Sequence, residues 1–202
     1  YCKKGNKVFY DAHNFPEKNA ARLIAALRGV NGIIANSSGT AEAFRKAGFG
    51  NVLVAHNGVD VAEFDIAFTR GEARMAMDLS QDTKIAMYVG HLYAWKGIDL
   101  VVSAAQNLSD ITFVIVGGTE KDIAKYEAIK KEQNINNLVF LGHRSRKDIP
   151  VLLRVADVLL LPNVAVSAES EKYTSPLKMF EYMASSTPIL ASDLPSIQEI
   201  LD

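Results

Sequence analysis

The sequence predicts an α/β protein whose parallel sheets, of the doubly wound, Rossmann-like kind, are covered by helices on both faces. Strand-like and helix-like segments alternate along the 202 residues, which is the pattern of βαβ units. The strand-like segments are short and almost continuously apolar, as expected for strands buried on both faces of a sheet. Glycines and polar residues directly follow several of them, at the edge where doubly wound proteins bind ligands.

The first part of the chain predicts a small sheet of its own. Hydrophobic patterns place strands near residues 8–12, 32–36 and 51–55, and helices at 16–27 and 38–47. The Asn57-Gly58 pair then predicts a turn, because both residues tolerate a positive φ angle.

A longer and more regular series of elements follows. We expect helices at 70–77, 96–108, 121–133 and 148–156 and one beginning near Ser175, between strands at 85–90, 111–117, 138–141, 158–161 and 188–191. A polar and aromatic connection separates this series from the first. We therefore place a domain boundary near residue 66, with a partial domain at 1–66 and a doubly wound domain at 67–202.

The composition narrows the class of partner. With 49% hydrophobic residues, 22% charged residues and a formal net charge of -1, the chain has no bulk electrostatic attraction to nucleic acid or anionic membranes. A phosphate must therefore be held by a local site. The single cysteine, Cys2, excludes an internal disulfide framework and is compatible with a reducing compartment. No apolar run approaches the ~18 residues of a membrane span.

The most informative segment is the helix that begins near Ser175. Ser175 is a suitable N-cap and Pro176 suits the first helical position, so the free N–H groups of Leu177 and Lys178 would point towards an anion. Glu181 follows within two helical turns and could reach a hydroxyl beside that anion. An anion next to a polyol is the outline of a sugar nucleotide. Alone, the pattern also fits an ordinary amphipathic helix with Lys178 and Glu181 as a solvated pair.

Two glycine-bearing loops follow the strongest strands. Gly90 opens a loop that ends at Lys96, a lysine that the dipole at a helix start disfavours unless an external phosphate offsets it. On the helix dipole alone, a solvated Lys96 without any ligand explains the pattern equally well. The Gly117-Gly118 pair lets the backbone pass close to a ligand, although such a pair is also a common turn. No Gly-x-Gly-x-x-Gly fingerprint occurs, which disfavours a nicotinamide enzyme.

The segment from Tyr173 to Asp193 resembles the nucleotide-binding domain of GT-B retaining glycosyltransferases of family 4, the glycosyl transferases group 1. The resemblance implies that the helix start holds the donor diphosphate and that Glu181 holds the nucleotide ribose. The residues that it assigns to the donor in this segment are Tyr173, Thr174, Ser175, Pro176, Leu177, Lys178 and Glu181.

One position departs from the family pattern. The family usually has a further Glu eight positions before Glu181, where this chain has Tyr173. Glu169 and Glu171 are nearby but out of register. How the donor sugar is held is therefore left open.

The loop after residue 89 matches the same family in chain order. There the family usually reads Gly-Arg, a variable stretch and Lys-Gly; Gly90, Lys96 and Gly97 match, and His91 replaces the Arg. Arginine is always charged, whereas an imidazole is mostly neutral at neutral pH. His91 would therefore need a bound diphosphate to keep it protonated, or it lies outside the site.

The resemblance implies two further donor contacts and one catalytic group. Gly117 and Gly118 would flank the sugar or nucleotide, and backbone groups after the strand at 138–141 would hold the base. Arg144, in that loop, has a side chain that can stack on a base, although an exposed Arg is the more frequent case. His13 ends a strand where the family often places a His near the reacting sugar, although a structural His is commoner at such a position.

The resemblance extends over essentially the whole chain. The segment from His56 to Asp60 resembles the family's interdomain linker Pro-Asn-Gly-Val-Asp, with His56 in place of Pro. Residues 1–66 would then be the C-terminal part of the acceptor-side domain with its linker, and 67–202 the donor domain, truncated at its C-terminus. The first residue is Tyr1 and the last ones lie within a helical pattern, so we expect a piece of a longer protein.

The implied activity is transfer of a sugar from a nucleoside diphosphate donor to an acceptor hydroxyl, with retention of configuration. His13, Lys96 and Glu181 are the implied catalytic residues. No Cys/His cluster has metal-ligand spacing and no Asp-x-Asp motif occurs, so we expect neither metal nor cofactor. We expect a carbohydrate or lipid-linked acceptor, no nucleic acid partner and a cytoplasmic protein. Peripheral association with the inner face of the membrane is left open.

Two other functions stay open. One is a catalytically degenerate module that only binds a sugar nucleotide, which Tyr173 and His91 favour. The other is a GT-B sugar-nucleotide epimerase, which would need additional acid-base carboxylates and histidines for which the sequence offers no convincing set.

Overall fold

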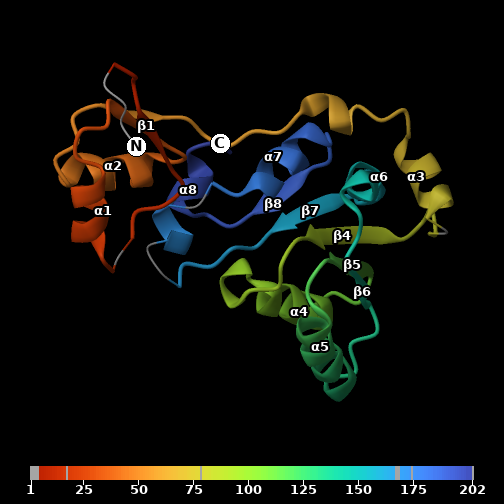
Figure 1. The fold of residues 1–202 in the computed structure, drawn as a ribbon. Helices are drawn as coiled ribbons and strands as arrows, with labels where there is room; N and C mark the ends of the chain where they lie inside the picture. Colours follow the sequence, from red (N-terminus) through yellow and green to blue (C-terminus); the bar gives the residue numbers. More distant parts are fainter. Residues whose placement is uncertain (1–4, 17, 78, 167–168, 174, 202) are drawn as a thin grey trace. The chain divides into compact units, whose positions relative to one another are not determined.

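The computed structural model describes residues 5–16, 18–77, 79–166, 169–173 and 175–201. The chain forms two compact units, and each is built on a parallel sheet (Figure 1). One unit comprises Tyr1–Gly58, Val164–Pro176 and Asp193–Asp202, and the other Val59–Asn163 and Leu177–Ser192. The sequence placed the boundary near residue 66. The units instead divide between Gly58 and Val59, and later segments of the chain return to the first.

The first unit contains a three-stranded parallel sheet. Its strands are β1 (Phe9–Ala12), β2 (Gly32–Ala35) and β3 (Val52–Val54), in that spatial order, and its helices are α1 (Ala20–Ala26) and α2 (Ser38–Lys46). Phe44 on α2 is fully buried and makes edge-to-face contacts with Tyr10, Phe15 and Phe49. These rings hold α2 on the sheet.

Two short elements from later in the chain belong to this unit. They are η4 (Glu169–Tyr173), a single π-helical turn, and α8 (Pro195–Gln198). Just after α8, the Glu199 carboxylate accepts a hydrogen bond of 2.9 Å from the backbone N–H of Ser38 at the start of α2. Asn57 donates from Nδ2 to the carbonyl oxygen of Ser175 at 2.6 Å. These long-range bonds explain why the unit is discontinuous in sequence.

The second unit is a five-stranded parallel sheet with the spatial order β6-β5-β4-β7-β8. Its strands are β4 (Lys84–Val89), β5 (Ile111–Val116), β6 (Leu138–Gly142), β7 (Val158–Leu161) and β8 (Ile189–Ala191). From β4 the chain adds strands towards one edge and then returns to add β7 and β8 on the other side. The topological switch point therefore lies between β4 and β7, where doubly wound sheets bind ligands.

Helices cover both faces of this sheet (Figure 1). One face carries α4 (Ile98–Asn107) and α5 (Glu120–Glu132), and the other α3 (Arg70–Ala76), α6 (Ile149–Val155) and α7 (Leu177–Ala184). Side chains alternate along β4: Met87 joins the core under α6 and α7, whereas Tyr88 joins the core under α4 and α5. Both cores are continuous apolar clusters, as the near-continuous apolar strands predicted. The predicted α/β fold class is confirmed.

Three single-turn 3-10 helices occupy the connections: η1 (Val61–Phe64), η2 (Ala94–Lys96) and η3 (Arg146–Asp148). The helix predicted from residue 96 begins instead at Ile98, because Gly97 adopts a left-handed conformation with φ of 73° that separates it from η2. The helix expected to begin just after Ser175 starts at Leu177. Within the described ranges, no helix combines the length and the apolar character that crossing a membrane requires.

Candidate anion site at the carboxyl ends of the second sheet

The candidate site lies where β4 and β5 end. Gly90 follows β4 with φ of 147°, and Gly117 and Gly118 follow β5 with φ of 104° and 83°. A Cβ atom on Gly118 would lie 2.7 Å from the Leu92 side chain, so both loops depend on residues without side chains. The sequence predicted that these glycines let the backbone pass close to a ligand; the structure shows that they let the two loops pack closely against other parts of the chain.

These strand ends enclose a cavity of about 390 Å³. It brings together five of the residues that the sequence assigned to the donor: Gly90, His91, Gly117, Gly118 and Arg144. Thr119 and His143 complete its polar lining. The predicted residues from three separate loops therefore do converge on one place.

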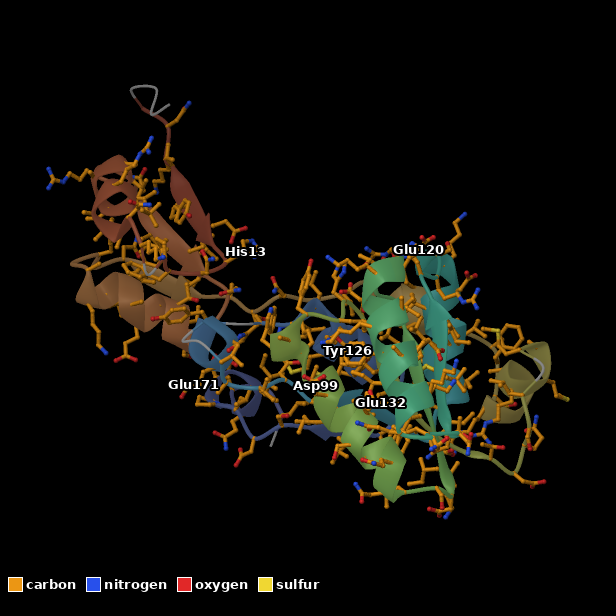
Figure 2. The ribbon with its side chains drawn as sticks, turned by 90° about the horizontal axis from the view of Figure 1, so that it is seen from below. His13, Asp99, Glu120, Tyr126, Glu132 and Glu171 are labelled. Carbon is orange, nitrogen blue, oxygen red and sulfur yellow. The ribbon has the colours of Figure 1, made fainter. Side chains whose placement is uncertain are left out.

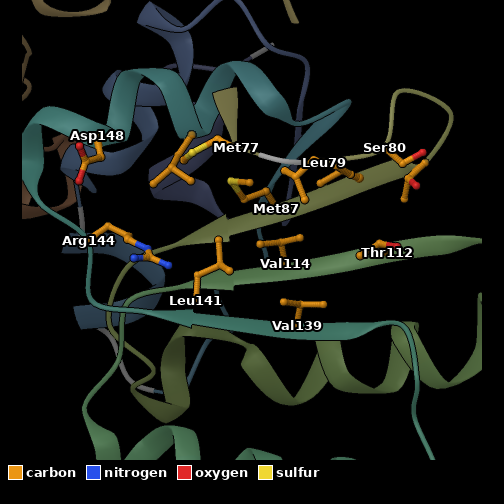
Figure 3. Close-up of a pocket in the computed structure, with 13 residues that line it drawn as sticks. Met77, Leu79, Ser80, Met87, Thr112, Val114, Val139, Leu141, Arg144 and Asp148 are labelled. Carbon is orange, nitrogen blue, oxygen red and sulfur yellow. The ribbon is translucent and has the colours of Figure 1, made fainter. Parts of the chain in front are cut away.

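A larger cavity, of about 480 Å³, lies over the same sheet away from the strand ends (Figure 3). Its walls are mainly apolar side chains of β4, β5 and β6, such as Met87, Val114 and Leu141, and Thr112 near the start of β5 lies at its far end. Arg144 lines both cavities. A phosphate needs several cations and a close approach of the backbone, and only the smaller cavity is lined by the strand-end glycines, with Lys178 Nζ against Gly90 as well as Arg144 in its wall. We therefore take the smaller cavity as the candidate site.

Lys178 lies at the same edge of the sheet. Its Nζ donates a hydrogen bond of 2.7 Å to the hydroxyl of Tyr88 and lies 3.9 Å from the centre of that ring. The Tyr88 hydroxyl in turn donates to the carbonyl oxygen of His91 at 2.6 Å. A Cβ atom on Gly90 would lie 3.2 Å from Nζ, which places the ammonium beside the end of β4.

Lys96 is a second cation at this edge. Its Nζ lies 3.5 Å from the centre of the Trp95 ring, and burial lowers the pKa of Lys96 to about 8. Burial also holds the pKa of Lys178 well below its ordinary value, and the charge of Lys96 acts in the same direction. The two ammonium groups therefore repel each other. Among the described residues, no carboxylate forms an ion pair with either of them.

Glu181, the predicted ribose ligand, is a half-buried residue of α7. Burial raises the pKa of its carboxyl group, while Arg146 and Lys178 oppose the shift and Glu63 adds to it. Arg146 is itself paired with Glu63, at 3.0 Å between Nη2 and Oε2. Glu181 thus lies within a small group of charges whose other members the sequence did not suggest.

The ring of His91 is exposed and stacks on Tyr93, with 5.1 Å between ring centres and an interplanar angle of 15°. The cavity at the strand ends includes His91 among its lining residues. The structure therefore leaves His91 beside the candidate site.

Leu177, a further predicted donor residue, begins α7 in the second unit, and its side chain is exposed. The predicted residues that remain belong to the first unit. Ser175 and Pro176 are buried, and the Ser175 hydroxyl accepts from the N–H of Asn57 at 3.4 Å. Tyr173 ends η4, and Thr174 lies outside the described residues. His13 follows β1, with Nε2 3.3 Å from a carboxylate oxygen of Asp11 and its ring exposed (Figure 2).

Two residues near the site were not predicted from the sequence. Tyr88 reads as one more apolar strand residue, and only its position at the end of β4 could have suggested a polar role. Asn163 follows β7 at the switch point and is 2% exposed, yet its Oδ1 has no hydrogen-bond partner among the described residues. A buried acceptor of this kind suits a ligand hydroxyl.

No three side chains of the His, Cys, Asp or Glu type gather into a possible metal site anywhere in the part of the chain that is described. The cations at this edge of the sheet include Arg144, which lines the cavity, and Lys96 and Lys178, with Glu181 close to Lys178.

The family model described as glycosyl transferases group 1 matches residues 70–202. The D-inositol 3-phosphate glycosyltransferases of Mycobacterium bovis (strain BCG / Pasteur 1173P2) and Mycobacterium tuberculosis (strain H37Rv) are each 31% identical to this chain over 144 residues. That alignment covers 69% of this chain and 28% of the relative, so the chain spans less than a third of the matched proteins.

Solved structures match nearly the whole chain. The Anabaena protein HepE in complex with UDP superposes with a TM-score of 0.80 at 20% identity, over 98% of this chain and 56% of that one. Sucrose-phosphate synthase from Thermosynechococcus elongatus superposes with a TM-score of 0.74 at 21% identity, over 95% of this chain and 51% of that one. The likeness to these glycosyltransferase structures agrees with the predicted GT-B type of fold.

Proposed function

Because the chain belongs to the glycosyl transferases group 1 family, we propose that it forms the donor-binding part of a glycosyltransferase that uses a nucleoside diphosphate sugar. The observation that carries this proposal is that Gly90, Gly117 and Gly118 line one cavity at the carboxyl ends of β4 and β5, with the ammonium of Lys178 against Gly90. The complexes of HepE with UDP and with UDP-glucose support a nucleotide sugar as the donor class.

The chemistry follows from where charge develops. When the bond between the sugar and the diphosphate breaks, negative charge accumulates on the leaving phosphate. Lys96 and the free N–H groups at the start of α7 would stabilise that charge, because they are positioned before the reaction begins. The Glu181 carboxylate would accept hydrogen bonds from the ribose hydroxyls and fix the nucleotide beside them.

The finer features of the reaction come from the family resemblance. We propose transfer to a hydroxyl of a carbohydrate or lipid-linked acceptor, with retention of configuration, with no metal and in the cytoplasm. His13 would act near the reacting sugar. The residues assigned to donor binding remain those named from the sequence, with Tyr173 in the place of the family's first Glu.

Calorimetric titration of the chain with UDP, GDP and ADP in the presence of a chelator tests the donor site. We expect one of the three to bind without metal, and we expect Lys96→Met to weaken that binding by about tenfold. Binding of none of the three, or binding only after a divalent cation is added, would overturn the proposal.

An assay for transfer of the sugar distinguishes an enzyme from a module that only binds the nucleotide sugar. If a UDP-sugar binds and its sugar is transferred to an acceptor hydroxyl with release of UDP, the site is catalytic. If UDP-sugars bind but no product forms with any donor and acceptor in a form of the protein that includes its acceptor-side half, the degenerate module is the better assignment. Release of an epimerised sugar nucleotide would assign the epimerase.

A further inference from the structure

The side chain of Lys178 takes an unusual path. Lys178 is the second residue of α7, where the helix dipole disfavours a positive charge. A surface lysine would extend into solvent, but this one bends across the end of the sheet to Tyr88. The bend places the ammonium against Gly90, which is one of the residues that line the candidate cavity.

Tyr88 holds this ammonium without neutralising it. Burial raises the pKa of the Tyr88 hydroxyl, so the phenol stays neutral, accepts from Lys178 and donates to the carbonyl oxygen of His91. Both hydrogen-bonding functions of the hydroxyl are therefore used. The aromatic face below adds a cation–π contact. Lys178 is positioned, yet its charge has no ion-pair partner among the described carboxylates.

We propose that the Lys178 ammonium, presented by Tyr88 beside Gly90, binds the donor diphosphate as the partner of Lys96. Lys178 is then a binding residue and Tyr88 a positioning residue. The inference rests on the proposed function, and it adds to it a side-chain role that the sequence did not suggest. A diphosphate suits the pair, because its several oxygens can accept from two ammonium groups and from the N–H groups of α7 at once.

The pair also predicts proton uptake on binding. Lys96 and Lys178 both have lowered pKa values, mainly through burial, and an anion between them would raise both. Within the described part of the chain, two other groups face Lys178: the Glu181 carboxyl on α7, whose charge opposes the lowering of the lysine pKa, and the Tyr88 hydroxyl on β4, which accepts a hydrogen bond from Nζ. Affinity for UDP is then greatest below the free-state pKa of Lys96, about 8, and falls as the pH rises through the bound-state values.

Titration of the chain with UDP and, separately, with uridine tests the assignment. Lys178→Met keeps the apolar stem but removes the charge, and it should weaken UDP binding by about tenfold while leaving uridine binding unchanged. Lys125→Met is the matched control, because Lys125 also lies over a tyrosine ring, 4.7 Å from the centre of Tyr126, but on α5. This control should bind UDP as the parent does.

Proton uptake distinguishes a ligand from a structural lysine. Titration in two buffers of different ionisation enthalpy, between pH 7 and pH 9, should show uptake by the parent and less uptake by Lys178→Met. Lys178→Arg should bind UDP with a flatter pH dependence, since a guanidinium does not titrate in this range. Lys178→Arg keeps the test available if Lys178→Met does not fold. Tyr88→Phe should weaken UDP binding severalfold, because the ring stays but the hydroxyl that fixes Nζ is lost.

The outcomes separate the two proposals. If Lys178→Met binds UDP as the parent does while Lys96→Met does not, the inference about Lys178 is wrong and the donor site stands. If the affinity is lost in His91→Ala instead, the second cation is His91. If the parent binds none of UDP, GDP and ADP, the proposed function itself fails.

Discussion

A Cβ atom on Gly117 would lie 2.4 Å from the carbonyl oxygen of Gly90, so the two loops at the candidate site touch backbone to backbone. Gly117 also has φ of 104°, a value that strains any residue with a side chain. Rotation of a side chain cannot relieve the contact, because the obstructing atom belongs to the main chain.

Gly117→Ala should therefore lower the free energy of unfolding by at least about 2 kcal/mol and weaken UDP binding as the loops separate. Urea denaturation and calorimetry measure the two effects. Gly50→Ala is the control, because nothing lies within 4 Å of a Cβ at that position. Equal stability of the two variants would contradict the backbone contact.

Arg74 should be the most important arginine for stability. It is 4% exposed and donates to Asp157 Oδ2 at 2.7 Å, to the carbonyl oxygen of Val155 at 3.1 Å and to that of Gln81 at 2.7 Å. Arg74→Met removes all three bonds and takes the guanidinium donor from the carbonyl of the buried Val155 and from the carboxylate of Asp157, so we expect a loss of about 3 kcal/mol in urea denaturation.

Lys84→Met is the comparison for that loss. Lys84 pairs with Asp110 at 3.0 Å, but both side chains are about two-thirds exposed, at 68% and 67%. Such a pair contributes little to stability, because solvent screens the two charges. A larger effect for Lys84→Met than for Arg74→Met would show that burial does not set the strength of these pairs.

Glu181→Gln should raise stability and lower donor affinity at the same time. Burial raises the folded-state pKa of Glu181, so the fold is most stable when this carboxyl is protonated and loses stability as the pH rises through that pKa. Glutamine avoids the ionisation, and the melting temperature at neutral pH should rise slightly. The gain should vanish at a pH below the ordinary range for Glu.

Glu181→Gln should weaken the binding of a nucleotide only if that nucleotide carries the ribose hydroxyls. UDP should bind the variant more weakly, whereas an analogue of UDP without the 2′- and 3′-hydroxyls should bind parent and variant alike. If the variant loses affinity equally for both compounds, Glu181 does not contact the ribose.

His13→Ala should abolish transfer without changing nucleotide binding. The His13 ring is exposed and contacts only Asp11 among the described side chains, so its removal should not disturb the fold. We expect a loss of about 100-fold or more in transfer rate with UDP affinity within about twofold of the parent, because a group that acts only on the reacting sugar affects the rate. An unchanged rate would remove His13 from the catalytic group.

The sequence predicted what local pattern controls. The strands of the second sheet and its glycine loops followed from apolar runs ending on Gly90 and Gly117, because a buried parallel strand and the loop after it have a clear signature. The convergence of these loops followed in turn, since parallel strands bring their carboxyl ends to one edge.

The side-chain contacts that could not be predicted from the sequence join residues that are far apart along the chain. The bond between Lys178 and Tyr88 joins residues 90 positions apart, and the pair of Arg146 and Glu63 joins residues 83 positions apart. No periodicity carries information over such separations. The helical pattern suggested Glu181 as the partner of Lys178. In the structure, the Lys178 ammonium instead donates its hydrogen bond to the hydroxyl of Tyr88.

The hydrogen bond from Ser38 to Glu199 joins residues separated by 161 positions, so it bears on the order in which the protein folds. Closing so long a loop is slow, because its entropy must be lost before any contact compensates for it. Strands β4 to β7 and their helices form from one uninterrupted stretch and can assemble first. The first unit, by contrast, is completed only when its later segments, among them α8 with Glu199, reach α2. Refolding should accordingly have a fast phase in the five-stranded sheet and a slower one in which α8 becomes protected from hydrogen exchange.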